Sequence, residues 1–190
     1  PSLKHKKFFY LWLGQLISIT GTQMQLWALF WHINQLDENP LALGGIGVAR
    51  ILPIIIFSLI GGALADSVDR RKVMFVTQSV AALLALTLAL FTQFGQVTIW
   101  HIYIITAMQA VVVAFDGPSR QALIPNLVPK KDLPNAFSMT FTAFQAGAVI
   151  GPALTGFVIA YFAQEAVYYF NAISFAAVLF ALFMIGDVPQ

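Results

Sequence analysis

The chain has 190 residues, of which 59% are hydrophobic and only 9% are charged, and its formal net charge is +2. Soluble domains carry about 25% charged residues, so this composition excludes soluble enzymes and disordered tails, and the small net charge excludes a phosphate-binding surface for nucleic acid. There is no cysteine, and the three histidines are too far apart in the sequence to predict a metal site. We therefore expect a protein of the lipid bilayer that has no cofactor and no nucleic-acid partner.

Six stretches are long and apolar enough to cross a bilayer as helices. Long continuous apolar runs favour helices, because membrane strands are short and alternate in polarity. The predicted fold class is therefore all-α, a polytopic membrane protein. The longest break between spans, 117–133, contains Pro118, Pro125 and Pro129. In chain order, the predicted spans are 8–33, 41–65, 73–94, 97–115, 134–162 and 166–185.

The basic residues predict the orientation in the membrane. All nine lysines and arginines outside the predicted spans precede the first span or follow the second and the fourth. Loops rich in lysine and arginine face the cytoplasm, so we expect a multi-pass protein of the plasma (inner) membrane with both termini in the cytoplasm. The chain begins with Pro1 and ends where the sixth span returns to that side. We expect a piece of a larger protein.

Polar residues inside two spans follow helical spacing. Such stripes either join helices by hydrogen bonds or line a water-filled cavity, and for these two we expect a cavity. The sixth span has little beyond Asn171 and Ser174 near its outer end and is predicted to be a supporting helix. The stripes are Gln15, Ser18, Thr22 and Gln25 in the first span and Asn135, Ser138, Thr142 and Gln145 in the fifth. The predicted cavity residues are Gln15, Thr22, Gln25, Gln109 and Gln145, together with Arg50.

Two ionisable residues in the spans need a partner. Arg50 lies nine residues into the second span, where a charge costs about 3 kcal/mol or more. It either extends outward to Asp37 and Glu38 or meets a substrate anion or a segment outside this chain. Asp116 ends the predicted fourth span; it is either an interfacial charge paired with Arg120 or a proton carrier. His32 and His101 are predicted at the outer interface.

The loop after the second span carries a specific pattern. Glycine and alanine here allow a close approach to a neighbouring helix. The pattern resembles the signature loop between the second and third helices of the major facilitator superfamily, G-x-L-a-D-R-x-G-R-[RK]. Ser67 and Asp69 stand where the family has arginine and glycine. The resemblance implies that the loop stabilises one state of a rocking motion. The matching residues are Gly62, Leu64, Asp66, Arg70 and Arg71.

The fifth span strengthens the resemblance. Gly147, Gly151, Pro152 and Gly156 resemble the motif G-x-x-x-G-P-x-x-G-G of proton-driven antiporters in the same superfamily. These small residues and the proline also predict close packing and a bend. Residues 115–125 and the pair Asn135-Ala136 look like the branch with enterobactin exporters and macrolide efflux pumps. Thr106 stands at the place of the fourth-helix arginine of many proton antiporters.

The resemblance implies that residues 1–190 are the N-terminal transmembrane bundle, two inverted three-helix repeats, of a twelve-helix transporter whose C-terminal half is absent from this chain. It implies a proton-coupled exporter of small amphipathic organic molecules, of the drug or siderophore type, working by alternating access. No P-loop for ATP is present, and no serine-protease motif or other catalytic residue predicts an enzyme. A permease subunit served by a separate ATPase, or a scaffold without transport activity, remains the alternative.

Overall fold

The computed structural model describes residues 1–186, with the exception of the side chains of 63–67. This part of the chain contains six α-helices and no strand, which confirms the all-α fold. Short 3-10 turns cover Ser2–Lys4 (η1), Ile124–Asn126 (η2) and Lys130–Asp132 (η3). The helices are α1 (Lys6–Leu36), α2 (Pro40–Ser67), α3 (Arg70–Gln93), α4 (Ile99–Leu123), α5 (Leu133–Tyr161) and α6 (Gln164–Ile185).

Five of the described helices, α2 to α6, are long and apolar enough to cross a membrane. Helix α1, with 31 residues, is also long enough to cross a membrane. It is less apolar than the others, because its sequence contains polar residues that include Gln15, Gln25 and His32. These side chains are buried inside the bundle, with at most 3% exposed, so they do not face lipid. The polarity of α1 therefore reflects its central position among apolar helices.

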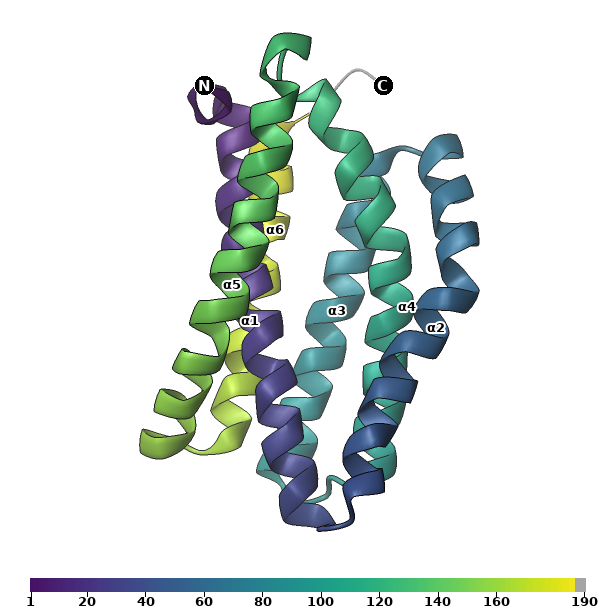
Figure 1. The fold of residues 1–190 in the computed structure, drawn as a ribbon, viewed down its shortest axis with the longest axis vertical. Helices are drawn as coiled ribbons and strands as arrows, with labels where there is room; N and C mark the ends of the chain where they lie inside the picture. Colours follow the sequence, from purple (N-terminus) through teal and green to yellow (C-terminus); the bar gives the residue numbers. More distant parts are fainter. Residues whose placement is uncertain (187–190) are drawn as a thin grey trace.

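The helices form two groups that run side by side (Figure 1). One group contains α1, α5 and α6, and the other contains α2, α3 and α4; the contact between α3 and α6 joins them. The main contacts come in equivalent pairs: α1 packs on α5 as α4 packs on α2, and α1 packs on α6 as α4 packs on α3. Exchange of 1 with 4, 2 with 5 and 3 with 6 thus preserves the arrangement, as expected for two three-helix repeats.

The N-terminus and the end of α6 lie at the same end of the bundle (Figure 1). The α2–α3 and α4–α5 connections lie at that end too, whereas the other three connections lie at the opposite end. An even number of crossings produces this geometry. Both basic connections and the lysine-rich start of α1 are therefore on one side of the bundle, as the sequence predicted, and the compartment that this side faces stays a prediction.

Helix α4 extends further than the sequence predicted. The prediction ended this span at residue 115 because Gly117 and Pro118 follow, but α4 continues to Leu123 with Pro118 inside it. A proline removes only one backbone hydrogen bond of the helix. The hydroxyl of Ser119 donates to the Phe115 carbonyl over 2.9 Å, and an ion pair also bridges this turn (described below). Asp116 consequently lies within the helix and not at its end.

Glycines set the closest approaches between helices. At Gly147 and Gly151 of α5, an added Cβ would lie 2.7 Å from the Cγ2 of Ile19 and 2.6 Å from the Cβ of Gln23, both on α1. At Gly156, the last glycine of the same motif, nothing lies within 4 Å. The first two glycines therefore fix which face of α5 contacts α1.

Gly61 of α2 approaches the backbone of α4 in the same way. An added Cβ would overlap the Ala114 carbonyl oxygen and lie 2.9 Å from the carbonyl carbon. Pro118 lacks an N–H, so the carbonyl four residues earlier, that of Ala114, loses its usual partner within the helix. The Gly61 backbone fills the space beside this carbonyl, which no larger residue could do without moving a helix.

Candidate functional site

A cavity of about 380 Å³ lies in the middle of the bundle, and all six helices contribute side chains to it. Small-molecule pockets commonly measure about 300–1,000 Å³. The sequence predicted a lining from four helices, and α3 and α6 join them here. The polar and aromatic lining residues are Gln15, Ser18, Thr22 and Gln23 of α1, Arg50 of α2, Gln78 of α3, Gln109, Asp116, Arg120 and Gln121 of α4, Thr140 and Phe144 of α5, and Asn171 and Phe175 of α6.

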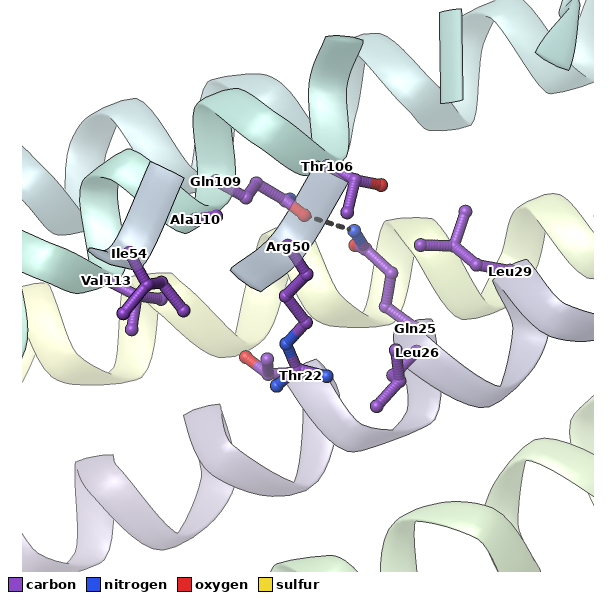
Figure 2. A pocket seen from close by; sticks show the side chains of 10 residues that line it. All are labelled: Thr22, Gln25, Leu26, Leu29, Arg50, Ile54, Thr106, Gln109, Ala110 and Val113. Atoms are coloured by element: carbon purple, nitrogen blue, oxygen red, sulfur yellow. Dashed lines mark hydrogen bonds between the residues drawn. The ribbon is translucent and has the colours of Figure 1, made fainter. Parts of the chain in front are cut away.

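A smaller crevice of about 60 Å³ adjoins this cavity between α1, α2 and α4. Thr22, Arg50 and Gln109 line both spaces, and Leu26, Leu29 and Ile54 give the crevice apolar walls. The Arg50 side chain extends from α2 across the crevice toward Thr22 of α1 (Figure 2). Gln25 lines the crevice as well, so the crevice brings together four of the residues that the sequence placed in one cavity.

A chain of amide hydrogen bonds connects three helices beside the crevice. Gln25 Nε2 donates to Gln109 Oε1 over 2.7 Å (Figure 2), and Asn171 Nδ2 donates to Gln25 Oε1 over 2.6 Å. The Ser174 hydroxyl lies 3.1 Å from Asn171 Oδ1. The sequence expected α6 to be a supporting helix; this expectation is corrected, because Asn171 reaches the amide of Gln25 and lines the cavity.

Several buried polar atoms at the site have no hydrogen-bond partner among the described residues. Both amide atoms of Gln15 are unpaired, and this side chain is only 1% exposed. Gln109 Nε2 and Thr106 Oγ1 are unpaired as well. A buried polar group without a partner costs about 1–3 kcal/mol. Water or a polar ligand is the ordinary explanation for such atoms, so their presence indicates a wet or ligand-binding interior.

Arg50 has no hydrogen bond or ion pair within the described part of the chain. The sequence offered Asp37 and Glu38 as partners if the side chain extended outward, but no ion pair joins them to Arg50. The side chain is half-buried and lies along the crevice (Figure 2). A guanidinium in this position needs an anion or water.

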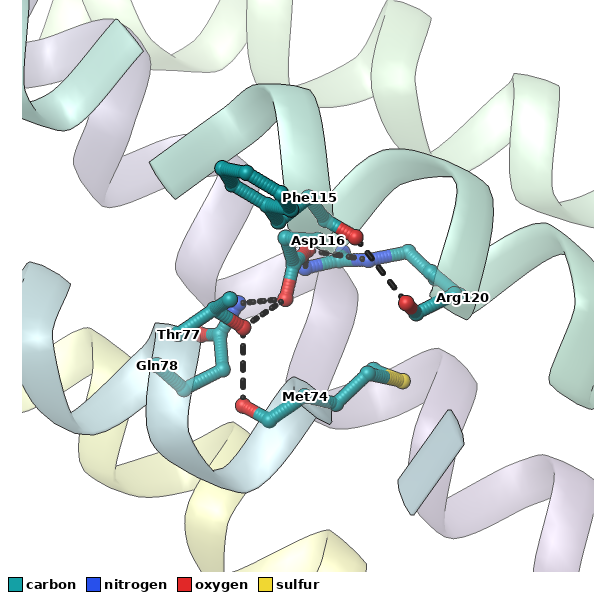
Figure 3. A network of polar contacts seen from close by, with 7 residues as sticks. Met74, Thr77, Gln78, Phe115, Asp116 and Arg120 are labelled. Carbon is teal, nitrogen blue, oxygen red and sulfur yellow. Dashed lines mark hydrogen bonds and ion pairs between the residues drawn. The ribbon is translucent and has the colours of Figure 1, made fainter. Parts of the chain in front are cut away.

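Asp116 is the acidic residue of the cavity lining, and four hydrogen bonds surround its carboxylate (Figure 3). The Thr77 hydroxyl and Gln78 Nε2 each donate to Oδ1 over 2.8 Å. Arg120 donates to Oδ2 from Nη2 over 2.6 Å and from Nε over 3.0 Å. The predicted pair with Arg120 therefore exists, and it lies against α3 with side chains that are 15% (Arg120) and 9% (Asp116) exposed. Sequence reasoning missed Thr77 and Gln78, because their adjacent positions in one apolar span form no stripe.

Gln145 is exposed on α5 and lines neither of the two spaces described above, so its place in the transport cavity stays a prediction. Thr140 and Phe144 face the cavity instead. They continue toward Gly147 and Gly151 at the spacing i, i+4, i+7 and i+11, which is one face of a helix. Because those glycines hold this face against α1, the predicted polar stripe points away from the cavity.

His32 lies near the end of α1 and is buried against another helix. It is 2% exposed, and its Nδ1 lies 2.9 Å from the Tyr168 hydroxyl. The bulky Tyr168 of α6 covers it, and its place at the outer interface stays a prediction. His101 forms a capping box with Thr98 at the start of α4, near the end of the bundle as predicted.

The basic residues of the loop after α2 bind the ends of two helices. Arg70 Nη1 donates to the Ala122 carbonyl of α4 over 3.1 Å, and Arg71 Nε donates to the Leu182 carbonyl of α6 over 2.9 Å. Basic side chains stabilise the unpaired carbonyls at helix C-termini. Gly62 has open space beside it. The Leu64 and Asp66 side chains of the same motif lie outside the described residues.

The chain is similar to transporters of several bacteria. It is 28% identical over 187 residues to the uncharacterized MFS-type transporter YfiS of Bacillus subtilis (strain 168), covering 96% of this chain and 44% of that protein. It is 29% identical over 187 residues to the staphyloferrin A transporter of Staphylococcus aureus (strain NCTC 8325 / PS 47), covering 96% of this chain and 45% of that protein. Macrolide efflux protein A of Streptococcus pyogenes is 22% identical over 148 residues, which are 78% of this chain and 36% of that protein.

The chain thus spans about half the length of the Bacillus and Staphylococcus relatives. The profile of the transmembrane secretion effector family matches residues 1–187, almost the whole chain. The relatives are major facilitator transporters, and the apolar helices described above make the chain a multi-pass membrane protein. The chain belongs to the transmembrane secretion effector family of the major facilitator superfamily.

Proposed function

We propose that this chain is the N-terminal half of a secondary active transporter that exports small amphipathic organic molecules by alternating access. A second six-helix half would cover the open side of the cavity, and the two halves would rock about the central site. The staphyloferrin A and macrolide efflux relatives support a cargo of the siderophore or drug type.

The observation that carries the proposal is the polar cavity at the centre of an apolar bundle. Gln15, buried and unpaired, and Arg50, without an ion pair in the described part, both line it. Unpaired buried groups are costly for a protein whose only task is to hold helices together. Phe144 and Phe175 add apolar surface, which suits a cargo with both polar and apolar parts.

We further propose that protons drive export, with Asp116 as the candidate proton carrier. It is the acidic residue of the cavity lining, and its carboxylate neutralises Arg120 at 2.6 Å. Protonation of Asp116 would leave the Arg120 guanidinium uncompensated, so a proton at this position would change the charge of the cavity. Protonation and cargo binding could then be coupled through that charge.

The test is efflux of the neutral amphipathic dye Nile red from cells that express the protein at its full natural length, with and without a protonophore. We expect expression to increase efflux, and the protonophore to abolish the increase. Efflux that persists after the proton gradient has collapsed would refute proton coupling. No efflux of any dye or siderophore by the protein alone would favour the alternative, a permease subunit or a scaffold without transport activity.

The proposed topology has both termini on the cytoplasmic side of the plasma (inner) membrane. The lysines and arginines at the end of the bundle where the N-terminus and the end of α6 lie support this orientation. An epitope tag at the N-terminus should stay inaccessible to an impermeant label in intact cells and react after permeabilisation. Labelling of intact cells would reverse the topology and, with it, the direction of transport.

A further inference from the structure

The charges that line the central cavity do not balance. Among the described residues, three charged side chains line it: Arg50, Asp116 and Arg120. Asp116 and Arg120 form an ion pair of 2.6 Å and neutralise each other. Arg50 remains, with no anion bound to it within the described residues. The lining therefore carries one excess positive charge, and this charge lies at the crevice between α1, α2 and α4.

The neutral groups of the crevice add donors beside that charge. The amide chain is directional: Asn171 donates to the oxygen of Gln25, and Gln25 donates to the oxygen of Gln109. Both glutamine oxygens are thereby used, and Gln109 Nε2 is left as an unpaired donor. The Thr106 hydroxyl, also unpaired and buried, lines the same crevice. The crevice thus offers a guanidinium, an amide N–H and hydroxyls, and none of its lining residues in the described part of the chain is a carboxylate.

This combination fits one kind of chemical group. A planar guanidinium binds carboxylate through two parallel hydrogen bonds, and amide and hydroxyl donors can complete the shell of the oxygens. One excess positive charge matches a carboxylate better than a phosphate monoester, which carries about −1.5 to −2. The walls made by Leu26, Leu29 and Ile54 leave room for an apolar continuation of the ligand.

We propose that this crevice binds the carboxylate of the transported molecule, and that the transporter therefore selects amphipathic monocarboxylates. Arg50 binds the carboxylate, Gln109 and Thr22 orient it, and the apolar part of the cargo lies in the larger cavity against Phe144 and Phe175. The proposal rests on the proposed transport function. The crevice is lined by residues of α1, α2 and α4, and none of the described lining residues supplies an anion to Arg50.

The test compares three fluorescent probes that differ only in their charged group: pyrenebutyrate, its neutral amide, and a pyrenebutyl trimethylammonium. Their affinities are measured by titration of the protein at its full natural length in lipid nanodiscs. We expect pyrenebutyrate to bind about tenfold or more tightly than the amide, because a charge-assisted pair is worth at least that factor. The ammonium should bind weakest.

Variants identify the residue responsible. Arg50→Gln should remove the preference for the carboxylate and leave amide binding within about twofold of wild type, whereas Arg50→Lys should keep part of the preference. Gln109→Glu supplies an acid to the crevice and should weaken pyrenebutyrate and strengthen the ammonium. Gln96→Glu, the same substitution at an exposed position of the α3–α4 connection, should leave the order of the three probes unchanged.

Three outcomes would overturn the proposal. Equal or weaker binding of pyrenebutyrate relative to the amide, including no binding of pyrenebutyrate, would remove the carboxylate preference. A preference that survives Arg50→Gln would place the site elsewhere. A lowered melting temperature of Arg50→Gln with an unchanged preference would identify a structural ion pair. Efflux of the neutral dye Nile red by the same wild-type protein separates these results from failure of the transport proposal, because this efflux can persist when the carboxylate preference is absent.

Discussion

Replacement of Gly61 by alanine tests how tightly α2 and α4 approach each other. The new Cβ would overlap the Ala114 carbonyl oxygen and lie 2.9 Å from the carbonyl carbon. Both atoms belong to the backbone of α4, so no side-chain rotation can relieve the overlap. Overpacking costs about 1–3 kcal/mol, and an overlap with backbone lies toward the upper end of that range. Alanine in a helix recovers about 1 kcal/mol relative to glycine. We expect a net loss of about 2 kcal/mol in the free energy of unfolding.

The neighbouring glycine provides a matched control. At Gly62, no atom of the described residues lies within 4 Å of an added Cβ, so Gly62→Ala should be neutral or gain up to about 1 kcal/mol from helix propensity. Yet Gly62, not Gly61, is the glycine of the family motif. If Gly62→Ala reduces transport while the free energy of unfolding is retained, then Gly62 is needed for the conformational change of transport. It is then not needed for helix packing in the conformation described here.

The assay is equilibrium unfolding of the two variants and the wild type at full natural length, in a titration with a denaturing detergent followed by tryptophan fluorescence. We expect Gly61→Ala to have a lower free energy of unfolding than wild type. We expect Gly62→Ala to be at least as stable as wild type. Equal free energies for the two variants, or a less stable Gly62→Ala, would refute the close approach at Ala114.

The remaining predictions concern α5, the buried ion pair and the loop. Gly147→Ala should lower stability by about 1–3 kcal/mol, because its Cβ would meet Ile19 on α1, whereas Gly156→Ala should not; equal thermal unfolding of the two would contradict this packing. Asp116→Asn should destabilise the protein by about 1–3 kcal/mol, because it leaves the half-buried Arg120 without its anion, and the second substitution Arg120→Gln should restore part of the loss; no restoration in the double variant would argue against the pair. Asp66→Asn should reduce efflux while membrane insertion, measured by fluorescence of a fused reporter, is retained; unchanged efflux would show that the loop serves only orientation.

Length and polarity alone predicted the helices of this protein. A helix must bury about 30 Å of apolar length to cross a bilayer, and every backbone group inside must be paired, so long apolar runs permit few other structures. The family motif around Gly62 could also be identified, because it depends on residue identity and spacing. The stripe of α1 was predictable for the same reason: Gln15 and Gln25 are too polar to face lipid, and both are buried.

For the helices other than α1, tertiary structure decided which face points into the bundle. In α5, the polar residues predicted an inward face that includes Gln145, but the approach of Gly151 to α1 turns Phe144 toward the cavity. In α6, Asn171 faces inward because it reaches Gln25.

Apolar side chains are compatible with both lipid and a helix interface, so the hydrophobic pattern of a membrane helix carries little information about its rotation. The sequence by itself therefore determined that six helices form and which loops share a side. Packing between helices decided which polar groups meet: it joined Thr77 and Gln78 to Asp116, and it left Arg50 in the crevice without an anion from the described part of the chain. These contacts depend on a few small residues at which two helix backbones approach closely. The effect of such a residue is visible only in the tertiary structure, because it depends on the neighbouring helix.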